Sequence, residues 1–368
     1  MLNAIKKIDK KILIIAGIII LSPILLILFL AIFRGCGNSK LTPEKYEEKM
    51  ISAAEKYFKD KEPTVESEVK TVKLSTLVKK EYIKSTEDLL DDDSCKGTVS
   101  VRLNGSTIEK NDGGFLNYTV NLECKNYKTN TLLSNLMDDV TTVGAGLYQE
   151  NGYHLYKGED VKNYIKFYGN DYRIINIDPE GMVKLLKVEV ESLDTVWDNK
   201  YNVAVNDTIG LNIYADSVIL KNMINSYNDP KIISSEAKKH IVSRSVCVDS
   251  RDMYNGTIGN YTCSNTLANQ VVSLVDVSDF AKASLDANCK SIYDKSCINY
   301  NYLKYLNLKT WTPVPASNNT YEVFYLSNGI IKTQDANKYD VYNLVIYIDG
   351  NEKLTSGEGK VDKPYVIK

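Results

Sequence analysis

Residues Tyr172–Val188 read YRIINIDPEGMVKLLKV, two apolar runs that flank a short polar turn. Both runs are rich in Ile, Val and Leu, and β-branched residues such as Ile and Val favour strands. Pro179 suits the first corner of a turn and Gly181 suits its close, so the stretch predicts a β-hairpin. Apolar runs on either side predict further strands at 164–167, 321–326, 329–331 and 344–348. The C-terminal part of the chain is therefore expected to form a sheet.

Two helices are expected between these strands, at Asp216–Tyr227 and Ser234–Val242, because apolar residues recur on one face of each. The region 247–300 follows no clear period and holds four cysteines. Helices that are segregated from strands, instead of alternating with them, are typical of the α+β class and not of a doubly wound sheet. We therefore expect residues 153–368 to form one α+β domain.

A smaller domain is expected at 42–130, with helices followed by a hairpin. Thr42 is a good helix N-cap and Pro43 suits the first helical position. The segment 131–152 is rich in Thr, Asn and Gly, so we interpret it as a linker or a short mobile helix. The elements predicted for the smaller domain are helices at 42–60 and 75–82 and strands at 99–103 and 118–122.

The segment Ile12–Phe33 is almost unbroken in apolar residues and predicts a transmembrane helix. At about 1.5 Å per residue it would span about 33 Å, enough for the apolar core of a bilayer. Residues 1–11 carry four lysines and one acid, which favours a cytoplasmic N-terminal tail and an extracellular chain after a tether at 34–41. A cleaved signal peptide is the alternative, but its apolar run is usually shorter and ends in small residues. The sequence thus predicts a single-pass protein of the cell membrane.

The charge balance argues against nucleic acid as a partner. The whole chain has a formal charge of −2, and residues 1–34 carry +4 from five basic residues and one acid, which leaves −6 on the remainder. Proteins that bind nucleic acid present a basic face to the phosphates. No basic cluster lies beyond the predicted anchor, so we expect no nucleic-acid partner.

Six of the seven cysteines are expected to form disulfides, as is usual in exported chains. Fifteen pairings are open to six cysteines, and proximity in sequence favours pairing neighbours. The seventh, Cys36, could join two chains in a dimer or carry a lipid. No Cys-x-x-Cys occurs and the chain has two histidines, so we expect no zinc and no cofactor. The predicted pairs are Cys95 with Cys124, Cys247 with Cys263, and Cys289 with Cys297.

The region from Tyr153 onwards resembles modules in surface proteins of low-GC Gram-positive bacteria that lie near the C-type-lectin-like and sulfatase-modifying-factor-like folds. The resemblance implies a lectin-like α+β domain, and we carry no catalytic residue across from it. The smaller domain resembles part of the pilins, without their processing signal. The stretches that carry the first resemblance are 163–167, 172–175, 275–280, 311–313, 321–348 and 364–367.

No constellation of residues indicates catalysis. His154 and His240 are the two histidines, and His240 sits in a charged helical stretch typical of a surface or capping residue, so a Ser-His-Asp triad is not expected. Two nearby carboxylates would suffice for a glycosidase, but the acids at 189, 191, 194 and 198 follow a strand in a pattern typical of solvated side chains. The run Asp91–Asp93 is interpreted as a solvated turn and not as a calcium loop.

Tyrosine is the most suggestive residue type, since the chain has 26 Tyr and 7 Phe. Rings with a polar edge favour contact surfaces, although the codon bias of low-GC genomes raises Tyr and Asn as well. The candidate ligand-binding residues are Trp197, Asp198, Asn199 and Trp311, with a place in the core as the alternative for both tryptophans.

The leading hypothesis is a membrane-anchored, adhesin-like binding protein of the bacterial cell surface whose ligand is a glycan or a protein. A structural component of the envelope or of a pilus-like assembly is the first alternative. A carboxylate-dependent extracellular hydrolase is the second alternative, and it predicts a deep pocket with close carboxylates.

Overall fold

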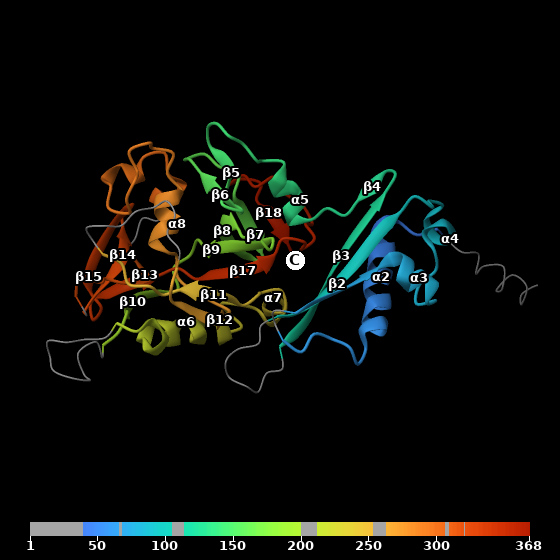
Figure 1. Cartoon of the computed structure of the whole chain (residues 1–368), viewed down its shortest axis with the longest axis horizontal. Coiled ribbons are helices and arrows are strands. Elements are labelled where there is room, and N and C mark those ends of the chain that lie inside the picture. Colours follow the sequence, from blue (N-terminus) through green and yellow to red (C-terminus); the bar gives the residue numbers. More distant parts are fainter. Residues whose placement is uncertain are drawn as a thin grey trace, which may run out of the picture.

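The computed structural model describes residues 40–65, 68–104, 114–199, 212–252, 263–305, 309–319 and 321–368. Its buried apolar side chains form two separate clusters, one in the N-terminal part of the chain and a larger one in the C-terminal part. Figure 1 shows the two parts side by side, with the N-terminal part in blue and cyan. The chain therefore has a smaller and a larger domain, each built on its own core.

The smaller domain packs helix α2 (Pro43–Phe58) against a twisted antiparallel sheet (Figure 1). Thr42 caps α2 by accepting a hydrogen bond from the backbone of Lys45, as the sequence predicts. Tyr46, Met50 and Ala54 of α2 are fully buried in the core of this domain. The other elements of this domain, with the four strands in the sheet order β1-β2-β3-β4, are β1 (Val69–Lys73), α3 (Leu74–Lys79), α4 (Thr86–Leu90), β2 (Lys96–Asn104), β3 (Phe115–Cys124) and β4 (Tyr127–Lys128).

A seven-stranded sheet is the centre of the larger domain. The hairpin predicted from Tyr172–Val188 is confirmed as β8 and β9, which turn through Pro179 and Gly181. Around it the path runs β17-β9-β8-β6-β5, with β7 on β8 and β18 on β7. The strands are β5 (Gly146–Glu150), β6 (Tyr153–Lys157), β7 (Tyr164–Phe167), β8 (Asn170–Ile177), β9 (Met182–Lys187), β17 (Val345–Asp349) and β18 (Tyr365–Ile367).

The rest of the larger domain adds a five-stranded sheet, a two-stranded ribbon and short helices. Figure 1 shows α6 below the ribbon and α8 beside the seven-stranded sheet. The sheet, in the order β10-β16-β13-β14-β15, consists of β10 (Ser192–Val196), β13 (Thr310–Pro315), β14 (Glu322–Ser327), β15 (Ile330–Asp335) and β16 (Tyr339–Tyr342). The ribbon is β11 (Arg244–Cys247) with β12 (Thr266–Gln270), and the helices are α5 (Leu132–Met137), η1 (Tyr214–Asp216), α6 (Val218–Asn228), α7 (Ser235–Lys238), α8 (Val277–Lys282), η2 (Lys295–Ile298) and η3 (Tyr302–Tyr305).

The fold class expected from the sequence needs correction. The described chain is mostly β-sheet with short helices, so the α+β class holds only in part. Across the described residues no helix is both long and apolar enough to cross a membrane. The described residues therefore lack the membrane-spanning helix on which the predicted anchored architecture and single-pass localisation depend. The tail at 1–11, the predicted span at 12–33 and Cys36 lie outside the described residues.

The segment 131–152 belongs to the larger domain and is not a linker. It contains α5 and β5, and Leu132, Leu136 and Leu147 are fully buried in the larger core. Strand β5 also pairs with β6 along its whole length. The Thr, Asn and Gly residues that suggested a linker serve instead as a cap and as turns: Thr131 caps α5, and Gly144 adopts a positive φ of 72°.

The two domains contact each other through buried polar groups. Glu352 of the larger domain is 6% exposed and accepts a hydrogen bond of 2.7 Å from the amide of Asn117 in β3. Glu47 of α2 is 1% exposed and lies 2.5 Å from Lys353, and it also accepts a hydrogen bond from Thr129. Buried polar groups are costly unless they are paired, so these bonds favour one arrangement of the two domains.

Candidate functional site

A pocket of about 900 Å³ opens in the larger domain between the seven-stranded sheet, helix α8 and the cystine-bearing loops. This volume lies in the upper range of small-molecule sites. The floor is a single row of residues from four neighbouring strands, because Leu155 pairs with Asn176, Asn176 with Lys184, and Lys184 with Tyr347. Directly paired residues in a sheet point to the same face, so one face of the sheet presents the whole row to the pocket.

A β-bulge sets the register of this row. The pairing of β8 with β9 shifts between Ile174 and Asn176, so that Asn176 lies opposite Lys184. An extra residue in one strand re-aims the side chains that follow it, and such bulges are over-represented next to functional sites. Ile175 points into the core at 2% exposed, and Asn176 then faces the pocket.

Lys184 and Asp279 form an ion pair in the floor of the pocket. The Lys184 ammonium lies 2.5 Å from the Asp279 carboxylate, and the two side chains are 9% and 11% exposed. Asp279 accepts a further hydrogen bond of 3.3 Å from Asn176. Burial by itself disfavours the charged lysine, but the attraction of Asp279 outweighs it and raises the pKa of Lys184. Lys184 is thus charged at neutral pH.

Helix α8 supplies the acidic side of the pocket. Asp276 caps the helix by accepting a hydrogen bond of 2.6 Å from the backbone of Ser278, and the backbone N–H of Asp276 donates to Asp279 at 3.0 Å. Asp276 also lies 3.5 Å from the guanidinium of Arg251. These contacts fix two carboxylates within one turn of chain, both in the pocket wall.

The rim carries an aromatic ring and further charges. Tyr153 lines the pocket and is 43% exposed, which makes its ring accessible to a ligand. Lys157 of β6 forms an ion pair with Glu150 of β5. Lys282 and Lys290 also line the pocket. The site therefore combines donors and acceptors in its floor with a ring and cations around its mouth.

All three predicted disulfides are confirmed. Cys247–Cys263 ties the ends of the β11–β12 ribbon, and Cys289–Cys297 closes the loop after α8. Cys247, Cys263 and Cys289 all line the pocket. A disulfide restricts the conformations of the loop that it closes, so these two bonds hold the irregular wall of the pocket in place.

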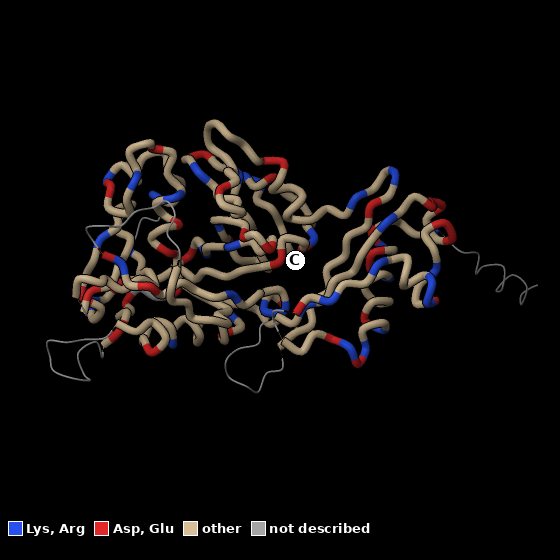
Figure 2. The backbone as a smooth tube through the Cα atoms, in the orientation of Figure 1, with Lys and Arg blue, Asp and Glu red and all other residues tan. Residues whose placement is uncertain are grey.

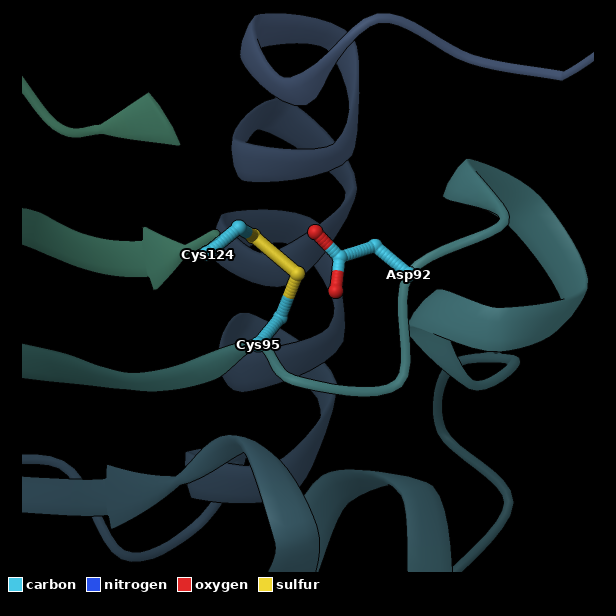
Figure 3. Close-up of side chains that lie close together, drawn as sticks. All are labelled: Asp92, Cys95 and Cys124. Carbon is cyan, nitrogen blue, oxygen red and sulfur yellow. A yellow bond between two sulfur atoms is a disulfide. The ribbon is translucent and has the colours of Figure 1, made fainter. Parts of the chain in front are cut away.

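The third disulfide, Cys95–Cys124, lies in the smaller domain beside Asp92 (Figure 3). The carboxylate of Asp92 accepts hydrogen bonds from Ser94 and from the backbone of Lys125, and the bond from the Ser94 hydroxyl contributes most to lowering the pKa of Asp92. Metals bind the thiolate form of cysteine, which a disulfide does not offer. Asp92 therefore closes a turn at the end of the hairpin.

The two tryptophans expected at a ligand site lie in the core. Trp197 and Trp311 are both 0% exposed. The indole of Trp197 donates to the Thr312 carbonyl and that of Trp311 to the Thr195 carbonyl, each at 2.9 Å, so the rings cross-link β10 and β13. Neither ring is accessible to a ligand in this structure.

The neighbours of Trp197 do not approach the pocket. Asp198 is 5% exposed, and its backbone donates to the Ala336 carbonyl, while Asn199 is exposed. Neither residue lines the pocket of about 900 Å³. A ligand role for Asn199 stays a prediction.

The residues weighed for catalysis are also dispersed. His240 is not a plain surface residue, since its ring lies 2.7 Å from the Tyr168 hydroxyl and 2.9 Å from Glu352 at the domain contact. Glu191, expected in solvent, forms an ion pair with Lys187 in which both side chains are at most 5% exposed. Neither residue lines the pocket.

The pocket residues were not predicted from the sequence, although two signals were present. The stretch 275–280, which carries part of the lectin-like resemblance, contains Asp276, Ser278 and Asp279. A second signal was Lys184, a charged residue between the apolar residues Val183 and Leu185 of β9. A charge in a buried strand requires a partner, and such a pair facing a pocket is a candidate for function.

A second pocket of about 450 Å³ lies between η1, β12 and the end of β13. The residues that line it carry no charge; they include Asn212, Asn265, Asn319 and Tyr214. Figure 2 shows that acidic and basic positions are otherwise mixed over both domains. The two pockets therefore differ in charge.

Comparison of the chain with protein-family models, with curated proteins and with solved structures found no significant match. The resemblances to lectin-like modules and to pilins therefore stay predictions.

Proposed function

We propose that the protein is a binding protein that takes a saccharide in the pocket of the larger domain. The observation that carries the proposal is the buried floor of Asn176, Lys184 and Asp279. These groups hold one another in place by hydrogen bonds, and an ammonium, an amide and a carboxylate each have further donor or acceptor positions for a ligand. A sugar hydroxyl both donates and accepts a hydrogen bond, so a ligand rich in hydroxyls can satisfy such a floor without any change of protonation.

The rim of the pocket fits the same ligand class. Sugar rings present apolar C–H faces between their hydroxyls, and the exposed ring of Tyr153 offers a flat apolar surface with a polar edge. An apolar ligand would displace water from the ion pair and from Asn176 and offer no hydrogen bond in its place, which is costly. The floor and the rim together favour a polar ligand with apolar faces.

The experiment is to probe the purified full chain, with its disulfides intact, against an array of saccharides and of extracellular-matrix proteins. Tyr153→Ala should weaken saccharide binding roughly five- to tenfold, since aromatic contacts contribute about 1 kcal/mol beyond burial. Tyr339→Ala is the matched control, because Tyr339 is 69% exposed on β16 and lies outside the pocket. Absence of saccharide binding, or binding that Tyr153→Ala leaves unchanged, would contradict the proposal.

A carboxylate-dependent hydrolase is the second candidate, because Asp276 and Asp279 line the same pocket. One observation counts against it. Both oxygens of Asp279 are engaged, Oδ1 by Asn176 and Oδ2 by Lys184 and the backbone of Asp276. Mass analysis of a bound oligosaccharide after incubation separates the two candidates: binding returns the ligand intact, whereas hydrolysis returns shorter products.

A further inference from the structure

The charges that line the pocket do not cancel. Five basic residues and three acidic residues contribute to its lining. Each acid has a basic partner within the pocket itself: Glu150 pairs with Lys157, Asp279 with Lys184, and Asp276 with Arg251. Lys282 and Lys290 remain, and neither forms an ion pair among the residues that the structure describes.

Both lysines are held at the mouth by ordered backbone. Lys282 is the last residue of α8, one turn after Asp279. The backbone N–H of Lys290 donates to the Asp294 carboxylate at 2.7 Å, and the Cys289–Cys297 bond closes the same loop. Lys290 is exposed and Lys282 is half-buried. Both ammonium groups can therefore bind a ligand without breaking an ion pair with another described residue.

The two carboxylates of this loop form no ion pair with Lys282 or Lys290 among the residues that the structure describes. Asp294 accepts from the backbones of Lys290 and Ser291, and Asp286 accepts from the Asn288 backbone and from the Asn299 amide. Both carboxylates accept hydrogen bonds within the turns of their own loop, and neither residue lines the pocket. Among the described residues that line the pocket, five basic residues against three acidic residues leave an excess of two positive charges, at Lys282 and Lys290.

We propose that the saccharide bound in this pocket is anionic, and that Lys282 and Lys290 bind its acidic group. This inference rests on the function proposed above and narrows it to a ligand class. Charged groups arranged in complementary fashion contribute specificity and speed of association, and pairs at an exposed rim are weakened by salt. A carboxylate and a sulfate ester share the required chemistry, so separate probes are needed for each.

The test compares three forms of one polysaccharide on the full chain: a polyuronate, the same polymer with its carboxyl groups reduced to alcohols, and the reduced polymer after sulfation. We expect the polyuronate to bind at least roughly tenfold more tightly than the reduced form. Its affinity should also fall as the salt concentration rises from about 50 to about 300 mM, because the Debye length shortens over this range. Tighter binding of the sulfated form than of the polyuronate would assign the anion as a sulfate.

Lysine variants test the anionic ligand separately from saccharide binding itself. The double change Lys282→Ala and Lys290→Ala should lower polyuronate affinity roughly five- to tenfold and leave the weak binding of the reduced polymer unchanged. The pair Lys332→Ala and Lys338→Ala removes two exposed lysines away from the pocket and should have no effect. Equal binding of charged and reduced polymers, or no effect of the Lys282 and Lys290 changes, overturns the anionic ligand alone. No binding of any form overturns the saccharide function as well.

Discussion

The ammonium group of Lys184 in β9 lies 2.5 Å from the carboxylate of Asp279 in α8, although 95 positions separate the two residues in sequence. Tyr347 of β17 lies beside the same ammonium, with 5.8 Å between the nitrogen and the ring centroid. The pair thus ties the sheet to the helix that forms the wall of the pocket. The attraction between the two charges offsets the free-energy cost of burying each of them.

Removing one partner of this pair should destabilise the fold strongly. Lys184→Met leaves Asp279 as a buried charge, and we expect a loss of about 3–5 kcal/mol in the free energy of unfolding. The double change Lys184→Met with Asp279→Leu removes both charges and should recover most of that loss. Urea unfolding of the three proteins measures the effect. A double variant no more stable than the single one would show that the pair does not act as a unit.

Alkaline pH should destabilise the smaller domain through Tyr46. Burial raises the pKa of Tyr46 to about 12, with a further contribution from Asp88, while its hydroxyl donates to the Lys84 carbonyl. In the unfolded chain the pKa of tyrosine is about 10, so above this pH the unfolded chain binds fewer protons than the folded chain. The stability that neutral Tyr46 contributes is therefore present below about pH 10 and is lost as the pH rises towards 12.

Unfolding measured between pH 8 and pH 11 should therefore show falling stability above about pH 10. Tyr46→Phe keeps the ring and removes the ionisable group, so its slope against pH should be shallower. Tyr339→Phe, at an exposed position, is the control and should match the parent chain. An unchanged slope in Tyr46→Phe would contradict the assignment.

Removing a disulfide of the smaller domain and removing one at the pocket should affect stability and ligand binding differently. Removing Cys95–Cys124 by double substitution with serine should cost about 2–5 kcal/mol and leave ligand binding intact, because this bond closes a 29-residue separation in the smaller domain only. Removing Cys247–Cys263 should weaken binding, because both residues line the pocket. Unfolding curves and ligand titrations on the two variants provide the comparison, and equal effects on binding would refute it.

The contact between Asn117 and Glu352 should couple the unfolding of the two domains. Asn117→Ala leaves the buried Glu352 with one partner fewer, at a cost of about 1–3 kcal/mol. We expect the single thermal transition of the parent to broaden or split in calorimetry. Asn121→Ala is the matched control, since Asn121 is exposed on the same strand. A transition that shifts without broadening would indicate that the domains unfold as one unit regardless of this bond.

Local signals in the sequence were sufficient for single elements. Thr42 and Pro43 predicted the start of α2, because capping depends on residues that are adjacent in the chain. The hairpin of β8 and β9 followed from apolar runs and the turn chemistry of Pro179 and Gly181. The three disulfides followed from proximity, since each joins cysteines at most 29 positions apart.

The same local reasoning failed where distant segments meet. The segment 131–152 looked like a linker because its composition is polar, yet β5 completes a sheet with β6. Local sequence could not choose between a ligand site and the core for Trp197 and Trp311; each donates to a carbonyl near the other, and both lie in the core. The composition of a segment does not show whether a distant part of the chain packs over it.

The sequence by itself determined helix α2, the hairpin of β8 and β9 and the three cystines, because periodicity, capping and turn chemistry act over a few residues. Only the tertiary structure decided the pocket, because its floor depends on the order of strands in a sheet and on one β-bulge. Asn176, Lys184 and Tyr347 share a row since β17 pairs with β9 and the register of β8 shifts before Asn176. That pairing is fixed by long-range packing of the whole core, and no short stretch of the chain contains it.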